Sequence, residues 1–371
     1  MYEPKLQEVS SPTRVAVIGC GYWGMNYVRV LSELPDAEVA VVCDQRPARL
    51  DEIGRRFDGI ALTTDCDEAL AADGIDAAVV CTEATSHRRI AGKALAQKLH
   101  VLVEKPLTVT VEEADELIAE AEAGGRILLV GHTFLYNAGV ERIKQLVRDG
   151  ELGDLYYVYA TRTNLGPFRT DVNALWDLAP HDIAIFNHLL DGMPEWVSAV
   201  GASVLRNGRQ DFGFISLGYP NGVVGHVHVS WADPQKVREF VIVGSDRRIA
   251  FNDVDLVERV RVFDRGVKPD LQSEPTSFGE HALQVRQGDV LSPAVPATEP
   301  LKQLCGHFLH CVRRGERPRT PGPDGRAVVA VMQAVERSLE RRGAPVSVFS
   351  AGLARIPLDI GLGRELAGSV R

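Results

Sequence analysis

The sequence predicts an α/β protein that has an N-terminal Rossmann dinucleotide-binding domain and a C-terminal α+β domain with a large, mostly antiparallel open sheet. Three observations carry this prediction. Short continuous apolar runs fill the first third of the chain, a glycine-rich turn follows the first run, and closely spaced apolar segments with turns between them follow beyond about residue 150. We expect a flexible N-terminus over 1–12, the Rossmann domain over 13–132 and the second domain over 133–371.

The apolar runs of the first domain are separated by longer segments rich in Ala, Glu and Leu. The runs are 14–18, 39–43, 77–81, 101–103 and 127–130. A short run without polar alternation is typical of a strand that is buried on both faces of a parallel sheet, and the segments between the runs would form the helices that cover it. The pattern therefore predicts five parallel strands with helical connections.

In the second domain the apolar segments follow one another closely, without long helical segments between them. Its predicted strands are 156–162, 197–205, 212–219, 223–231, 239–243 and 257–263. Turn signals at 207–208 and 220–222 favour antiparallel neighbours. We expect 266–300 to run over the surface, and two helices to follow at 300–313 and 324–341.

The composition of the chain limits which kinds of binding partner we expect. The chain has 41 basic and 50 acidic side chains, a net charge of −9, which argues against nucleic acid or an anionic membrane as a partner. The sequence has no apolar run of membrane-spanning length, and its start lacks a signal-peptide pattern, so we expect a cytoplasmic protein. The six cysteines lack zinc spacing, and we expect neither a metal nor a disulfide framework.

A GxGxxG turn follows the first predicted strand. Gly19 permits the tight turn, Gly21 lets a pyrophosphate approach the backbone, and Gly24 lets the helix pack closely on the strand. Asp44 ends the second strand, where it would bind the adenosine ribose and repel a 2′-phosphate. This favours NAD over NADP, although Arg46 could hold such a phosphate. The candidate cofactor residues in these two segments are Gly19, Gly21, Tyr22, Trp23, Gly24 and Asp44.

Two further segments carry candidate reaction chemistry. Glu104-Lys105-Pro106 follows a predicted strand, at the sheet edge where open α/β sheets bind ligands. The other segment, 176–182 (WDLAPHD), leads into an apolar run. Pro180 fits the first turn of a helix there, which would place Asp177 before the helix and His181 near its start. A carboxylate near an imidazole suits a general base, but a surface cap would have the same pattern.

Together these motifs resemble the Gfo/Idh/MocA family of oxidoreductases, which includes glucose-fructose oxidoreductase and inositol dehydrogenase. The resemblance covers nearly the whole chain, and residues 161–188 look most like the sugar-nucleotide 3-dehydrogenase branch. It implies that Lys105 hydrogen-bonds the reacting hydroxyl, next to a Lys105–Pro106 bond that is often cis. It also implies that His181 is the general base or acid and that Asp177 lies beside substrate and base. Asn137 lies where the family crosses from the first domain towards the site.

One segment departs from the family pattern. Residues 81–87 have Glu83 and Ala84 where many relatives have a proline-containing loop, so the contacts of this loop are open. We include Thr82, His87, Glu104 and Lys105 among the candidate cofactor residues, although His87 could equally be a loop histidine without a special role.

Four polar residues precede Asp177 and could bind sugar hydroxyls or a phosphate, or could be solvated loop residues. They are Arg162, Asn164, Arg169 and Asn173. With Lys105, Asn137, Asp177 and His181 they form the candidate substrate site. The candidate catalytic residues are Lys105, His181 and Asp177.

The leading interpretation is an NAD-dependent dehydrogenase that acts on a ring hydroxyl of a sugar or sugar nucleotide, at C3. A dehydrogenase of inositol or a simple aldose and a deoxysugar ketoreductase are alternatives within the same class. A glycosidase with tightly held NAD and a non-catalytic NAD-binding regulator are alternatives from other classes. The uncovered face of the second sheet, like the family resemblance, predicts a homodimer or homotetramer through that face.

Overall fold

The computed structural model describes residues 11–166, 168–169, 171–205, 208–270 and 283–349. Within these ranges the chain divides into two compact units. The first holds residues 11–137 and 298–329, and the second holds 138–297 and 330–349. Residues 1–10 of the expected flexible N-terminus lie outside the described residues. None of the helices in the described ranges has the length and hydropathy of a membrane span.

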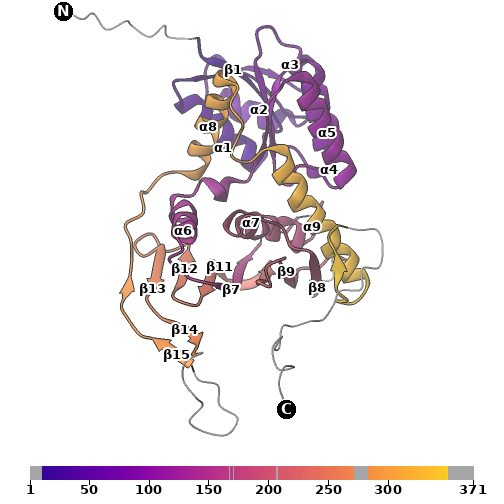
Figure 1. The fold of residues 1–371 in the computed structure, drawn as a ribbon. Coiled ribbons are helices and arrows are strands. Elements are labelled where there is room, and N and C mark those ends of the chain that lie inside the picture. The colour runs from indigo at the N-terminus through magenta and orange to yellow at the C-terminus, as the bar shows by residue number, and fades with distance from the viewer. Residues whose placement is uncertain (1–10, 167, 170, 206–207, 271–282, 350–371) are drawn as a thin grey trace, which may run out of the picture. The chain divides into compact units, whose positions relative to one another are not determined.

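The first unit is built on a six-stranded parallel sheet with the strand order β3-β2-β1-β4-β5-β6 (Figure 1). The strands are β1 (Thr13–Ile18), β2 (Ala37–Cys43), β3 (Ala61–Thr63), β4 (Ala77–Val80), β5 (His100–Glu104) and β6 (Leu128–Gly131). The five predicted strands are confirmed. The sequence missed β3 because this edge strand has three residues and none of them is buried.

Helices connect these strands and cover the sheet. They are α1 (Tyr22–Glu33), α2 (Pro47–Gly54), α3 (Cys66–Leu70), α4 (Ala84–Ala96) and α5 (Val111–Gly124), and a 3₁₀ turn, η1 (Thr133–Tyr136), follows β6. Helix α8 (Pro300–Arg314) belongs to this unit too, since it packs on α1 and Lys302 pairs with Glu33 at 3.0 Å. The division by contacts thus differs from the predicted one, which left residues 300–313 in the second domain.

The second unit is built on a nine-stranded sheet with the order β16-β13-β12-β11-β7-β10-β9-β8-β17. Its strands are β7 (Leu155–Leu165), β8 (Trp196–Ala202), β9 (Phe212–Gly218), β10 (Val224–Ser230), β11 (Ala232–Gly244), β12 (Arg248–Asn252), β13 (Val260–Phe263), β16 (Val290–Leu291) and β17 (Val346–Ser347). Among them only β7 and β10 pair in parallel. The mostly antiparallel sheet is therefore confirmed.

The helices α6 (Ala138–Arg148) and α7 (Ala174–Leu189) pack against this sheet (Figure 1). The second late helix, α9 (Gly322–Glu340), starts in the first unit and ends in the second. The predicted surface excursion contains a short hairpin of β14 (Gly266–Pro269) and β15 (Leu283–Arg286), and residues 271–282 lie outside the described part of the chain.

One face of the large sheet exposes aromatic side chains. Tyr157 and Tyr159 on β7 are 46% and 37% exposed, and Phe214 on β9 is 38% exposed. The rings of Phe214 and His228 stack with their centroids 4.6 Å apart, and the His226 ring stacks on Phe214 at 6.1 Å. Since Val158, Ala160 and Ile215, which alternate with these aromatic residues along the strands, are buried, this surface is the second face of the sheet.

Candidate active site

The glycine-rich turn joins β1 to α1 and has the shape of a phosphate-binding turn. Gly19 has a φ of +92°, a conformation that residues with a Cβ rarely adopt, and a Cβ at Gly24 would collide with the backbone of Gly19. Around Gly21, by contrast, no other atom of the described residues, apart from those of Gly21 and its chain neighbours, lies within 4 Å of the place where a Cβ would stand. Gly21 is also the residue that caps α1. The turn thus leaves room beside the helix N-terminus, which fits a pyrophosphate.

Asp44 lies directly after β2 and beside this turn. Its carboxylate accepts the backbone N–H of Cys20 at 2.7 Å, and the Arg46 guanidinium donates to its two oxygens at 2.9 and 3.0 Å. Burial alone would raise the pKa of Asp44, but the hydrogen bonds from Arg46 and Cys20 lower it below the ordinary value. Asp44 is therefore an ionised acceptor at the predicted ribose position, with Arg46 bound to it.

The predicted Glu104-Lys105-Pro106 segment ends β5, and the Lys105–Pro106 peptide is cis, as the resemblance implies. Glu104 and Lys105 are 6% and 8% exposed. The Tyr27 hydroxyl donates to one oxygen of Glu104 at 2.8 Å, and the Lys105 N–H donates to the other at 3.0 Å. Burial and the charge of Glu104 raise the pKa of Tyr27, so its hydroxyl stays a donor. Glu104 thus anchors the backbone of Lys105.

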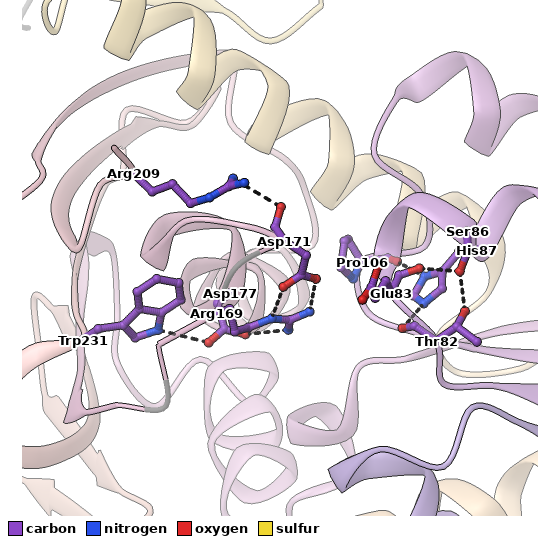
Figure 2. Close-up of polar contacts among 10 residues, drawn as sticks. All are labelled: Thr82, Glu83, Ser86, His87, Pro106, Arg169, Asp171, Asp177, Arg209 and Trp231. Atoms are coloured by element: carbon purple, nitrogen blue, oxygen red, sulfur yellow. Dashed lines mark hydrogen bonds and ion pairs between the residues drawn. The ribbon is translucent and has the colours of Figure 1, made fainter. Parts of the chain in front are cut away.

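His87 holds the same segment from the other side. Its ring, 1% exposed, lies between two backbone carbonyls, with Nδ1 2.8 Å from the oxygen of Pro106 and Nε2 3.1 Å from that of Thr82 (Figure 2). A neutral imidazole has one N–H and can donate to one of them only, whereas an imidazolium satisfies both. The His87 ring therefore bridges the backbone at Thr82 and at Pro106. Glu83, where the chain departs from the family pattern, is the N-cap residue of α4, and it is exposed and makes no side-chain capping hydrogen bond.

Sequence reasoning missed His132. It follows β6, the neighbour of β5, and its ring is 2% exposed with no hydrogen-bond partner for either nitrogen among the described residues. Burial, assisted by the charge of Lys105, lowers the pKa of His132 to about 4, so the ring is neutral. The available signal was a polar residue directly after a buried strand, at the ligand-binding edge of the sheet. Asn137, the predicted crossing residue, is 1% exposed at the end of η1.

The predicted start of the reaction-site helix is wrong. Helix α7 begins at Ala174 and contains Pro180 in its interior. The Asn173 side chain caps the helix, since it accepts the Trp176 N–H at 2.9 Å. A proline inside a helix loses one backbone hydrogen bond, and the burial of most of α7 offsets that cost. Asp177 therefore lies in the first turn.

His181 lies one turn after Asp177, and residues four positions apart share one face of a helix. The structure thus brings these two predicted residues together. Figure 2 shows the surroundings of Asp177: Arg169 lies between the carboxylates of Asp171 and Asp177, and the Trp231 indole points at Asp177. Arg169 donates to Asp177 at 3.0 Å, and Trp231 donates to the other oxygen at 3.2 Å.

The polar residues before Asp177 make hydrogen bonds to other residues of the second unit. Arg162 is 5% exposed and makes two 2.8 Å bonds to Asp182, which join β7 to α7. The Asn164 amide donates to the carbonyl of Gly166. Asn173 is the cap of α7 and also donates to Gln210 at 3.0 Å. These bonds hold Arg162, Asn164 and Asn173 within the second unit, and their part in substrate binding stays a prediction.

Arg169 is also bound by side chains of the same unit, those of Asp171 and Asp177. Burial opposes its charge, but hydrogen bonds to Asp171 and the charges of Asp177 and Asp171 raise its pKa above the ordinary value. The residue is thus a cation neutralised by two carboxylates. Elsewhere in the described ranges, no group of three or more His, Cys, Asp or Glu is arranged to hold a metal ion.

Comparison with known proteins identifies the family. Residues 13–132 match the oxidoreductase family with an NAD-binding Rossmann fold, and residues 140–250 match the GFO/IDH/MocA C-terminal domain. The chain belongs to the Gfo/Idh/MocA family. It is therefore an NAD-dependent oxidoreductase, and the turn at Gly21 and the acceptor at Asp44 fit that cofactor.

Three proteins show the range of this similarity. D-apiose dehydrogenase from Paraburkholderia graminis is 24% identical, over 92% of this chain and 94% of that protein. The crystal structure of GenD2 from gentamicin A biosynthesis, in complex with NAD, has a TM-score of 0.77 and 25% identity over 94% of this chain and 99% of that one. UDP-N-acetylglucosamine 3-dehydrogenase GnnA from Acidithiobacillus ferrooxidans, with a TM-score of 0.73 and 22% identity over 89% and 99%, shares the fold.

The bond between Asp44 and Arg46 generates a prediction about the cofactor. Asp44→Ser should weaken NAD binding by roughly tenfold, because a charged acceptor for the ribose is lost, and should improve the relative binding of NADP, because Arg46 is released for a 2′-phosphate. Dissociation constants from fluorescence titration with both nucleotides measure this. Asp67→Ser, which removes an exposed carboxylate of the same unit, is the control. Tighter binding of NADP than NAD by the native protein would show that Asp44 is misread.

Proposed function

We propose that this enzyme transfers a hydride between a ring secondary alcohol of a sugar or sugar nucleotide, at C3, and NAD. The observation that carries the proposal is the buried Lys105 at the carboxyl end of β5, in the same parallel sheet whose β1 leads into the dinucleotide turn. In open α/β sheets the ligand lies at that edge. The Asp177–His181 pair on α7 supplies the proton acceptor that the reaction needs.

Oxidation of an alcohol removes a hydride from carbon and a proton from oxygen. Bound NAD supplies the hydride acceptor. The ammonium of Lys105 donates a hydrogen bond to the substrate oxygen and stabilises the negative charge that develops there in the transition state. His181 takes the hydroxyl proton, and the carbon–oxygen bond becomes a carbonyl. In the reverse direction His181 returns the proton as a general acid.

Asp177 supports His181 in this scheme. A carboxylate on the same helix face favours the imidazolium that forms when the ring takes the proton. Arg169 and Trp231 occupy different oxygens of the carboxylate, so its orientation is set before substrate binds. In the first unit, Glu104 and His87 hold the Lys105 segment at the sheet edge.

The relatives support a sugar as the substrate class. D-apiose dehydrogenase and UDP-N-acetylglucosamine 3-dehydrogenase carry sugar and nucleotide-sugar substrates in their names, and a nucleotide sugar is our first choice. A free aldose, inositol or a deoxysugar intermediate is the alternative within the same chemistry. An NAD-dependent glycosidase would differ in that it releases a leaving group without net reduction of NAD. Six free cysteines in the described ranges fit the cytoplasmic location that we propose.

The exposed aromatic face supports self-association. Tyr157, Tyr159 and Phe214 form an apolar surface with His226 and His228, and burial lowers the pKa of both histidines, which favours their neutral forms. We propose that a second copy of the chain covers this face in a homodimer or homotetramer.

Lys105→Ala and His181→Ala should each lower turnover by about 10²–10⁴-fold, because each removes a group that acts on the reacting oxygen. NAD affinity should change little, since the phosphates are held at the glycine turn. The double variant should lose less than the product of the two single losses, because both groups serve one proton transfer. The measurement is reduced-NAD absorbance over a panel of nucleotide sugars and free sugars, with NAD affinity measured in parallel.

Near-normal turnover in His181→Ala would remove the base assignment. Unfolding of either variant, seen by circular dichroism, would point to a structural role instead. Arg326→Ala, which breaks an exposed ion pair with Asp115, is the control for a surface charge of similar size.

The association can be tested through Phe214. Phe214→Asp places a charge in the centre of the aromatic face and should shift the protein to monomers in light scattering at micromolar concentration. Leu256→Asp is the control, because Leu256 is 82% exposed and lies outside this face. A native protein that is already monomeric at that concentration would contradict the proposal.

A further inference from the structure

We propose that Trp231 is a positioning residue that orients the carboxylate of Asp177 beside His181. This inference rests on the proposed function, because the orientation of Asp177 matters for turnover only if His181 moves the proton. The sequence placed Trp231 at the end of a predicted strand and gave it no further role. In the structure it directly follows β10 and its side chain is 0% exposed.

A fully buried indole N–H needs an acceptor, because leaving it unpaired costs free energy. For Trp231 this acceptor is a carboxylate. Its Nε1 donates to Oδ2 of Asp177 at 3.2 Å (Figure 2). Arg169 Nη1 donates to the other oxygen, Oδ1, at 3.0 Å. Two donors on two oxygens fix the rotation of the carboxylate about its Cβ–Cγ bond, which a single donor does not.

Trp231 is the more rigid of the two donors. Its backbone N–H donates to the carbonyl of Asp211 at 2.8 Å, and its backbone carbonyl accepts the N–H of Gly166 at 3.1 Å. The Phe168 ring packs edge-on against the indole with the centroids 6.4 Å apart. The indole is thus fixed through its backbone and its ring.

Arg169, by contrast, divides its guanidinium between two carboxylates, and its side chain is 33% exposed. Without the indole N–H, Asp177 would keep its bond to Arg169 at Oδ1 but would lose the rigid donor at Oδ2, so the carboxylate would be oriented less strictly. A smaller fraction of molecules would then hold His181 in the arrangement that accepts the substrate proton. The expected defect is in turnover rather than in cofactor binding.

The test compares two substitutions that remove the same chemical group. Trp231→Phe removes the indole N–H that binds Asp177, and Trp176→Phe removes an indole N–H that binds Glu336 at 2.6 Å in the same unit. With UDP-N-acetylglucosamine and NAD as probes, Trp231→Phe should lower kcat roughly tenfold with the Kd of NAD unchanged. Trp176→Phe should change kcat by less than about twofold, whatever its effect on thermal stability. In an Asp177→Asn background, Trp231→Phe should cause no further loss, because the group it orients is already gone.

A second measurement does not depend on a substrate. The indole ¹H–¹⁵N resonance of Trp231, assigned by its loss in Trp231→Phe, should shift in Asp177→Asn, while that of Trp176 should stay in place. An unmoved Trp231 resonance, an equal kcat loss in Trp176→Phe, or a loss that adds to that of Asp177→Asn would overturn the inference. If the native protein turns over no sugar, or if His181→Ala is normal, the proposed function fails. The resonance then still decides whether Trp231 holds Asp177.

Discussion

A carboxylate taken out of water needs hydrogen bonds or an opposite charge, and this requirement arranges both units. In the first unit Glu104 lies at the end of β5, and its bonds from Tyr27 and from the N–H of Lys105 fix the backbone that presents the lysine. In the second unit Asp182 pairs with Arg162 and joins the reaction-site helix to the sheet beneath it. The groups that would carry out the chemistry thus lie next to residues that are held by hydrogen bonds to buried carboxylates.

The sequence predicted well whatever depends on neighbours along the chain. Continuous apolar runs located the buried parallel strands, and the glycine turn was recognisable because its function depends on local backbone. It predicted poorly whatever depends on partners far along the chain. Arg162 is a candidate for substrate binding because its type suits that role, and nothing near it in the sequence predicts its ion pair with Asp182. The helix start was misplaced because Pro180 was weighed as a first-turn proline, while the cap at Asn173 was overlooked.

The cofactor side and the substrate side of the proposed site differ in how well the sequence predicted them. The cofactor side is a standard turn with an acidic partner, so family membership and the geometry of Gly21 and Asp44 agree on NAD. The other residues of the candidate site have partners that no local sequence pattern reveals. His87 is held between two carbonyls, and Asp177 between Arg169 and Trp231. These contacts orient the His87 ring and the Asp177 carboxylate, and the sequence alone does not reveal them.

We propose that the enzyme transfers a hydride from a ring carbon of a sugar to NAD. This proposal is tested most directly with UDP-N-acetylglucosamine deuterated at C3 and mass spectrometry of the nicotinamide product. The account predicts that the deuterium appears in the reduced cofactor, and that the rate falls relative to the protiated sugar when hydride transfer limits turnover. Reduced cofactor without deuterium would contradict oxidation at C3. Consumption of the sugar with deuterium retained, and with no net reduction of NAD, would contradict the dehydrogenase itself.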